Sequence, residues 1–152
     1  MTNSEVIKQA WAKLARENSD VFGDLTSDLL STKIETCSEL VHDKNGNPAL
    51  AMARLRFNGK IMEPSVEISE LVLDLEQKPA LEVILHEMAH AAVGYEYGTL
   101  FYDENKGHNS EWYWYVDALN KKGFDITETG EKYFESLFTD EELASYYDDE
   151  DF

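Results

Sequence analysis

The N-terminal part of the chain has a helical pattern of hydrophobic and polar positions. Apolar side chains recur every three to four residues in this part, and Thr2 followed by Glu5 has the spacing of a capping box. The pattern predicts an amphipathic first helix. Its predicted buried face consists of Val6, Ala10, Trp11 and Leu14. Residues 19–31 are also rich in apolar side chains and predict a second short helix, although Gly23 weakens that prediction.

In the middle of the chain the hydrophobic period changes to two residues. β-Compatible runs cover residues 34–41, 49–57 and 61–68, and Asn-Gly turns separate them. This arrangement predicts a small three-stranded antiparallel meander. Because proline cannot donate a hydrogen bond to a neighbouring strand, the strand that contains Pro64 is expected to lie at an edge or to contain a bulge.

The remainder of the chain is predicted to be mainly helical. A long helix has Pro79 in its first turn, where the missing N–H costs least, and Gly94 as a stop signal. Another helix is predicted to start near Asn109 or Ser110 and to stop by Gly123. The order of helix, small sheet and further helices indicates an α+β fold in a single domain.

The size and charge of the chain narrow its function class. With 152 residues, of which 43% are hydrophobic and 29% charged, it has the size and composition of one soluble domain. Its 31 Asp and Glu residues outnumber its 13 Lys and Arg residues, which gives a formal net charge of −18. Nucleic-acid-binding proteins draw much of their affinity from neutralising phosphates. The charge therefore argues against direct nucleic-acid binding.

The sequence favours a reduced, cytoplasmic setting. The only cysteine is Cys37, so the chain forms neither an internal disulfide nor a cysteine-rich zinc ribbon. The N-terminus lacks the pattern of a secretory signal, and no apolar run approaches the roughly 18–20 residues that a membrane span requires. We therefore expect a cytoplasmic protein without a membrane segment, and we expect it to be a monomer.

The strongest chemical signal is an HExxH motif, His86-Glu87-Met88-Ala89-His90. Residues four apart share one face of a helix, so the imidazoles of His86 and His90 can bind the same metal ion. Glu87 then lies beside them, within reach of a water molecule on that metal. The apolar flanks of the motif supply the buried helix that such a site needs. The motif predicts a metal site with Glu87 as the base, in preference to a purely structural pair of histidines.

A catalytic zinc site usually takes a third protein ligand and keeps one position for water. His108 stands at the start of the last predicted helix, where a polar, glycine-containing connection can bring it back over the first two histidines. His42 lies beside a predicted turn and is expected to be solvent-exposed. Glu111 is the rival ligand, since it lies 21 positions after His90, a spacing that thermolysin-like proteins use for a glutamate. We favour His108, keep Glu111 as the alternative, and expect zinc without excluding other transition metals.

The chain resembles the SprT-like (Spartan-like) metallopeptidase family over roughly residues 1–124. That family combines an N-terminal helical part, a small sheet, an HExxH helix and a downstream segment of the His-Gly-x-x-Phe type. Here the segment reads His108-Asn109-Ser110-Glu111-Trp112, in which Asn109 replaces the glycine and Trp112 takes the aromatic position. Many relatives add a cysteine zinc ribbon, so this chain resembles a minimal core of the family without one.

The resemblance implies a zincin-like α+β domain over residues 1–130. Residues 131–152 would then form a short helix and an acidic tail that pack on this domain or extend from it, with Thr139 and Glu142 at capping-box spacing. The resemblance also implies Zn²⁺ as the cofactor. The implied zinc ligands are His86, His90 and His108, and the implied catalytic base is Glu87.

Two function classes stay open at this point. The leading one is a zinc metalloendopeptidase that hydrolyses peptide bonds through a metal-activated water. The alternative is a non-catalytic acidic protein-interaction module, or a DNA mimic, with a structural zinc site. A structural site needs no base beside an open coordination position, so Glu87 favours the enzyme. The expected partners are protein or peptide substrates, DNA-associated proteins among them, and residues 61–68 are expected to align an extended peptide as an edge strand.

Overall fold

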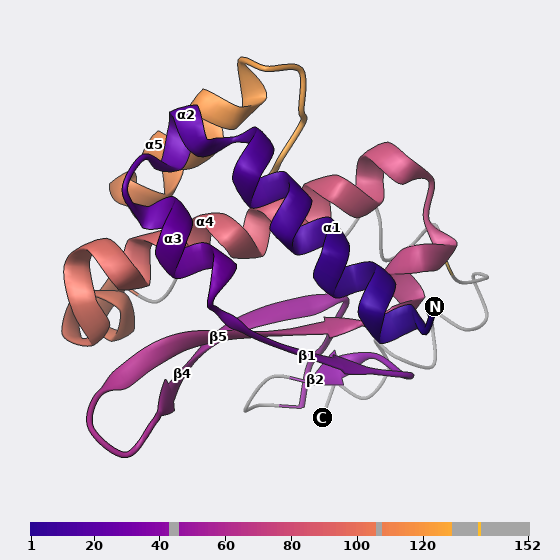
Figure 1. The fold of residues 1–152 in the computed structure, drawn as a ribbon, viewed down its shortest axis with the longest axis horizontal. Coiled ribbons are helices and arrows are strands. Elements are labelled where there is room, and N and C mark those ends of the chain that lie inside the picture. Colours follow the sequence, from indigo (N-terminus) through magenta and orange to yellow (C-terminus); the bar gives the residue numbers. More distant parts are fainter. Residues whose placement is uncertain (43–45, 106–107, 129–136, 138–152) are drawn as a thin grey trace, which may run out of the picture.

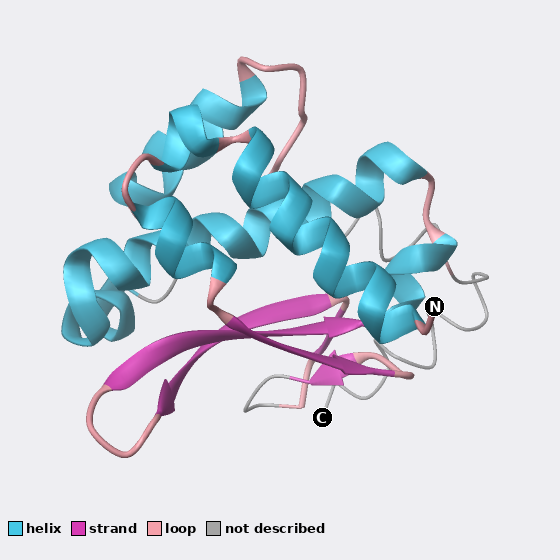
Figure 2. Cartoon of the chain, viewed as in Figure 1, coloured by secondary structure: helices cyan, strands magenta, loops and turns pink. Residues whose placement is uncertain are grey.

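The computed structural model describes residues 1–42, 46–105, 108–128 and 137, with the backbone alone for residues 99–105. These residues form an α+β fold in which helices cover one face of a small sheet (Figure 1). Figure 2 shows the two layers by secondary structure. The helices are α1 (Asn3–Glu17), α2 (Ser19–Phe22), α3 (Leu25–Leu30), the 3-10 helix η1 (Glu70–Asp74), α4 (Gln77–Asn105) and α5 (Ser110–Asn120). The strands are β1 (Lys33–Cys37), β2 (Val41–His42), β3 (Pro48–Ala49), β4 (Ala51–Phe57) and β5 (Met62–Ser69).

The predicted N-cap at Thr2 begins α1, although Glu5 contacts the Thr2 hydroxyl and not the Thr2 backbone N–H of a full capping box. The Thr2 hydroxyl accepts the Glu5 backbone N–H at 3.1 Å and donates to the Glu5 carboxylate at 3.1 Å. The predicted buried face is wrong at Val6, which is 37% exposed. The face that packs inward is centred on Trp11 and consists of Ile7, Trp11, Leu14 and Ala15. This set has the i, i+4, i+7, i+8 spacing of one helical stripe, and Val6 lies outside it.

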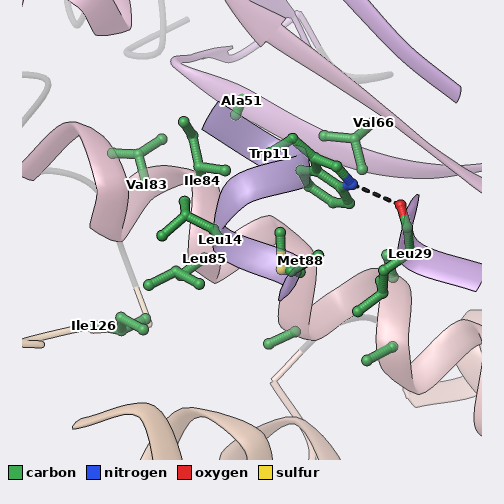
Figure 3. Close-up of a cluster of buried hydrophobic side chains, with 14 of the residues drawn as sticks. Trp11, Leu14, Leu29, Ala51, Val66, Val83, Ile84, Leu85, Met88 and Ile126 are labelled. Carbon is green, nitrogen blue, oxygen red and sulfur yellow. Dashed lines mark hydrogen bonds between the residues drawn. The ribbon is translucent and has the colours of Figure 1, made fainter. Parts of the chain in front are cut away.

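The single helix predicted for residues 19–31 is divided in two. The break lies at Gly23, which has a φ of 56° and follows the last residue of α2. Residues other than glycine rarely adopt a positive φ. Gly23 therefore ends α2 and redirects the chain into α3. The redirection brings the Leu29 carbonyl to the indole of Trp11, whose Nε1–H donates to it at 2.7 Å (Figure 3). Trp11 is only 2% exposed, and this bond satisfies its one polar group.

β5 lies at the centre of the main sheet, whose strand order is β1-β5-β4. β4 pairs with β5 in antiparallel orientation, as predicted, but β1 pairs with β5 in parallel orientation. The antiparallel meander is therefore wrong for the first strand. The chain between β1 and β4 forms a separate ladder of β2 with β3, and the strand predicted for residues 49–57 is interrupted at Leu50. β1 consequently reaches the side of β5 opposite to β4.

The turn between β4 and β5 has the predicted Asn-Gly form. The Asn58 side-chain oxygen accepts the backbone N–H groups of Lys60 at 2.9 Å and Ile61 at 3.0 Å. Gly59 follows with a φ of 101°. This side-chain bonding to the turn backbone is the physical basis of the asparagine preference at such positions.

Pro64 lies in the central strand, which corrects the expectation that its strand is at an edge. The Ser69 backbone N–H donates to the Leu50 carbonyl at 2.8 Å, and hydrogen-bonded and non-hydrogen-bonded pairs alternate along an antiparallel ladder. By this alternation the pair of Leu55 with Pro64 is non-hydrogen-bonded, so the proline nitrogen faces away from β4. The β1 ladder begins only at Ser65. Pro64 therefore removes no hydrogen bond from either ladder.

α4 begins as predicted but does not stop at Gly94. Pro79 lies in its first turn, and the helical assignment continues to Asn105 across a break at Gly98. Gly98 has φ 81° and ψ 176°, a region that is essentially restricted to glycine. Gly94 is buried inside the helix. Its stop signal is overridden because this turn is buried in the packed interior, where the helix continues.

α5 and the residues after it have the predicted start and end. The Asn109 side chain caps α5 by accepting the Trp112 backbone N–H at 2.9 Å. The helix ends at Asn120, before Gly123 with its φ of 110°. The helix predicted from Thr139 and the acidic tail lie outside the described residues, although Leu137 packs partly buried against the core. No helix in the described part of the chain has the length and apolar character to cross a membrane.

Candidate metal centre

Three histidines, two from α4 and one from the connection to α5, meet on one side of α4. His86 and His90 lie one turn apart on α4, and His108 lies just before the cap of α5. One ring nitrogen from each imidazole lies within 4.8 Å of the other two. The Nε2 atoms of His86 and His108 are 3.2 Å apart. The HExxH pair and the more distant histidine are thus brought together by the packing of α5 against α4.

This geometry fits a transition-metal site. Zinc–nitrogen bonds of about 2.0–2.1 Å in tetrahedral geometry place two ligand nitrogens about 3.3 Å apart. The 3.2 Å between the Nε2 atoms of His86 and His108 agrees with that spacing. The rival ligand Glu111 does not join the cluster, and its Oε2 accepts the Ser110 hydroxyl at 2.9 Å. His42 is exposed on β2, as predicted.

Burial keeps the imidazoles neutral. It lowers the pKa of His86 to about 4, and repulsion from His108 adds to this, while the Thr127 carbonyl opposes it. Burial also lowers the pKa of His90 well below its usual value. Electrostatic repulsion from His86 and His108 lowers it further. Partial desolvation lowers the pKa of His108 as well, and the negative charge of Glu128 opposes this shift. Neutral imidazoles carry the free lone pairs that metal binding requires, so the three rings are in the ligating protonation state at pH 7.

Glu87 is buried beside the histidines, with 7% of its surface exposed. Its Oε1 lies 3.9 Å from Nε2 of His86. Burial raises the pKa of Glu87 to about 7, and a hydrogen bond from the Ala53 backbone N–H on β4 opposes this shift. The carboxyl group can therefore both accept and release a proton near neutral pH.

Trp112 forms the floor under all three imidazoles and is fully buried. Its ring centroid lies 4.9 Å from that of His86, 5.4 Å from that of His90 and 4.4 Å from that of His108. Its Nε1–H donates to the His86 carbonyl at 3.3 Å. The resemblance placed Trp112 at the aromatic position of its segment without revealing these contacts with the histidines.

The backbone after α5 orients His86. The Thr127 carbonyl accepts from Nδ1 of His86 at 2.8 Å, which leaves Nε2 free to face the other two rings. The Asn120 side chain holds this segment, because it accepts the Ile126 N–H at 2.8 Å and donates to the Ile126 carbonyl at 3.1 Å. The buried Glu82 carboxylate also accepts the Asp125 N–H. Sequence analysis missed these contacts, since backbone groups contribute no motif.

Replacing Asn120 with alanine is expected to weaken zinc binding about tenfold, because groups that orient a metal-ligating histidine affect metal affinity by roughly 10–100-fold. Asn120→Asp keeps the acceptor for the Ile126 N–H and is expected to lose less. Competition with a chromophoric chelator measures the affinity, and circular dichroism checks the fold. Wild-type affinity in Asn120→Ala would contradict this role for the 125–127 segment.

A sequence model of the SprT-like family matches residues 26–131, which is more than half of the chain. The matched range contains the main sheet, the HExxH motif and His108. Searches of curated proteins and of solved structures returned no match. The family match confirms the resemblance inferred from the sequence. The chain belongs to the SprT-like family.

Proposed function

We propose that the chain is a zinc-dependent metallopeptidase that hydrolyses peptide bonds in protein or peptide substrates. The observation that carries this proposal is the meeting of three neutral imidazoles beside one buried carboxyl group. Membership of the SprT-like family is compatible with it. His86, His90 and His108 would hold the zinc ion.

Zinc suits this set of ligands because imidazole nitrogens are among its preferred donors and three protein ligands leave one position open. A zinc ion bound there would supply Lewis-acid chemistry, by polarising the substrate carbonyl and by lowering the pKa of a water molecule. His86 is already oriented toward such an ion by the Thr127 carbonyl.

Glu87 is proposed as the general base and acid. It would take a proton from the attacking water and later deliver it to the nitrogen of the leaving amine. Both steps need a carboxyl group that can exchange a proton, and burial raises the pKa of Glu87 to about 7 in the metal-free protein. The Ala53 N–H fixes the direction of this carboxyl group.

β4 is proposed as the strand that aligns the substrate. The sequence assigned this role to residues 61–68, but β5 is the central strand and has neighbours on both sides. The described residues place no strand on the outer side of β4. By the alternation of the β4–β5 ladder, the backbone groups of Ala53 and Leu55 face this outer side. Because the Ala53 N–H binds Glu87, a peptide paired with β4 would pass beside that carboxyl group.

Removal and replacement of the metal tests the proposal. Purified protein is expected to contain about one zinc ion per chain and to cleave an unfolded protein substrate. A chelator that strips the zinc is expected to abolish cleavage, and stoichiometric zinc is expected to restore it. Elemental analysis and gel electrophoresis of the substrate give the two readouts. Undiminished cleavage by protein shown to be metal-free would refute the proposal.

A further inference from the structure

A cavity of about 690 Å³ opens beside the N-terminal end of α5. The connection from α2 to α3 forms one wall, and residues from α4 and α5 form the others. Its chemically distinctive lining residues are Asp24, Glu96, Tyr97, Glu111, Trp114 and Tyr115. None of the lining residues that the structure describes is basic. The cavity thus presents negative charge without a neutralising partner from its own described wall.

Two exposed aromatic side chains stand at this cavity. Trp114 is 60% exposed and Tyr97 is 44% exposed, whereas Tyr115 is buried and stacks on Phe22 with a centroid distance of 5.6 Å. Core packing accounts for Tyr115 but not for Trp114, which presents most of its surface to solvent. An aromatic face attracts a cation, and it also covers the aliphatic stem of a long basic side chain.

The carboxylates are held close to these rings. Glu96 accepts a hydrogen bond from the Tyr115 hydroxyl, and Glu111 accepts one from Ser110. Partial desolvation, and then the negative charges of Glu96 and Glu111, raise the pKa of Tyr97. Both carboxylates therefore act on the same aromatic side chain, one from α4 and the other from α5. This combination suits a guanidinium or ammonium group.

The cavity shares both of its helices with the candidate metal centre. Glu96 and Tyr97 lie on α4 after His90, and Glu111 follows His108 by three residues. The cavity and the metal centre are therefore formed in part by the same stretches of α4 and of the start of α5. The connection is through the same rigid elements that bring the histidines together.

We propose that this cavity is a subsite for an arginine or lysine side chain of the peptide substrate, between the carboxylates of Asp24, Glu96 and Glu111 and the rings of Tyr97 and Trp114. The inference rests on the proposed peptidase function for its link to a substrate. It names the substrate class as peptides with a basic residue close to the cleaved bond. The cation-binding step itself can be measured without any turnover.

A binding experiment with two small probes tests the subsite. N-acetyl-arginine methylamide carries the charge, and N-acetyl-citrulline methylamide has a similar shape without it. The zinc-loaded, ¹⁵N-labelled protein is titrated with each probe, and the Trp114 indole N–H resonance is followed. We expect the arginine probe to give a saturable shift of this resonance. The citrulline probe is expected to bind at least about fivefold more weakly than the arginine probe.

Charge variants locate the binding. Asp24 is exposed and makes no capping hydrogen bond to α3, so Asp24→Lys and the milder Asp24→Asn are expected to fold. Asp24→Lys is expected to lower the affinity for the arginine probe about fivefold, and Asp24→Asn is expected to lower it about twofold. Asp117→Lys makes the same charge change on α5, at a position outside the cavity lining. Its affinity for the arginine probe should stay within about twofold of wild type.

Equal binding of the two probes, or equal effects of Asp24→Lys and Asp117→Lys, would overturn the subsite. The outcome is separable from the fate of the peptidase proposal. Normal peptide cleavage with no charge preference at Trp114 would remove the subsite alone. Charge-selective binding by a zinc-loaded protein that cleaves nothing would overturn the link to a peptide substrate.

Discussion

The Glu87→Gln variant is expected to keep its metal and lose peptide hydrolysis. Glutamine has nearly the same shape as glutamate, and its side-chain oxygen can still accept the Ala53 N–H. It cannot take up or release the proton that hydrolysis requires. General acid–base catalysis contributes roughly 10²–10⁴-fold, so kcat/KM is expected to fall by a factor in that range. Zinc content and cleavage of an unfolded substrate are measured on the same sample.

The matched control for this experiment is Glu17→Gln. Glu17 ends α1 with its side chain 56% exposed, so this variant makes the same chemical change away from the candidate site. It should retain wild-type activity and zinc content. Full activity in Glu87→Gln would refute the role of Glu87 as base. A zinc-loaded wild-type protein without turnover would instead favour the acidic interaction module with a structural metal.

The features that sequence analysis predicted correctly are those with local causes. The caps at Thr2 and Asn109 form hydrogen bonds within three residues, and the Asn58 turn does the same. The HExxH spacing likewise needs only a helix to place His86 and His90 on one face. Each of these follows from neighbours in the chain, and so the pattern of residue types is sufficient to find it.

The errors have non-local causes. Nothing in the residues of β1 distinguishes a parallel pairing with β5 from an antiparallel pairing with its successor, since the choice depends on the path of the chain through β2 and β3. Gly94 satisfies the rule for a helix stop, yet burial of that turn continues the helix to a break at Gly98. In both cases the outcome depends on the tertiary structure and cannot be derived from the local sequence.

The candidate site was predictable from its side chains but not from its backbone. The three histidines could be found because the chain has only four, and Glu87 could be found because it follows His86 in the HExxH motif. The Thr127 carbonyl that orients His86, and the Ala53 N–H that binds Glu87, belong to residue types without a distinctive signal. Such supporting groups become visible only when the fold brings distant segments together.

Substitution of His108 is expected to lower the zinc affinity far more than substitution of the rival ligand Glu111. His108→Ala removes one of three proposed ligands, and we expect zinc affinity to fall at least about a hundredfold, since even indirect supports of a ligand cost roughly 10–100-fold. His108 is exposed, so its truncation opens no cavity in the core. Glu111→Gln leaves the imidazole cluster intact, and its zinc affinity is expected to stay within about twofold of wild type.

Competition titration with a chromophoric chelator measures both variants, and thermal unfolding of the metal-free forms checks that each is folded. The two variants can be compared directly because His108 and Glu111 lie only three residues apart, around the start of α5. His108 is the one that faces the histidine pair of α4. Loss of zinc from Glu111→Gln with retention in His108→Ala would reverse the assignment. It would require α5 to turn Glu111 toward α4, and the contact between the Nε2 atoms of His86 and His108 would then have to break.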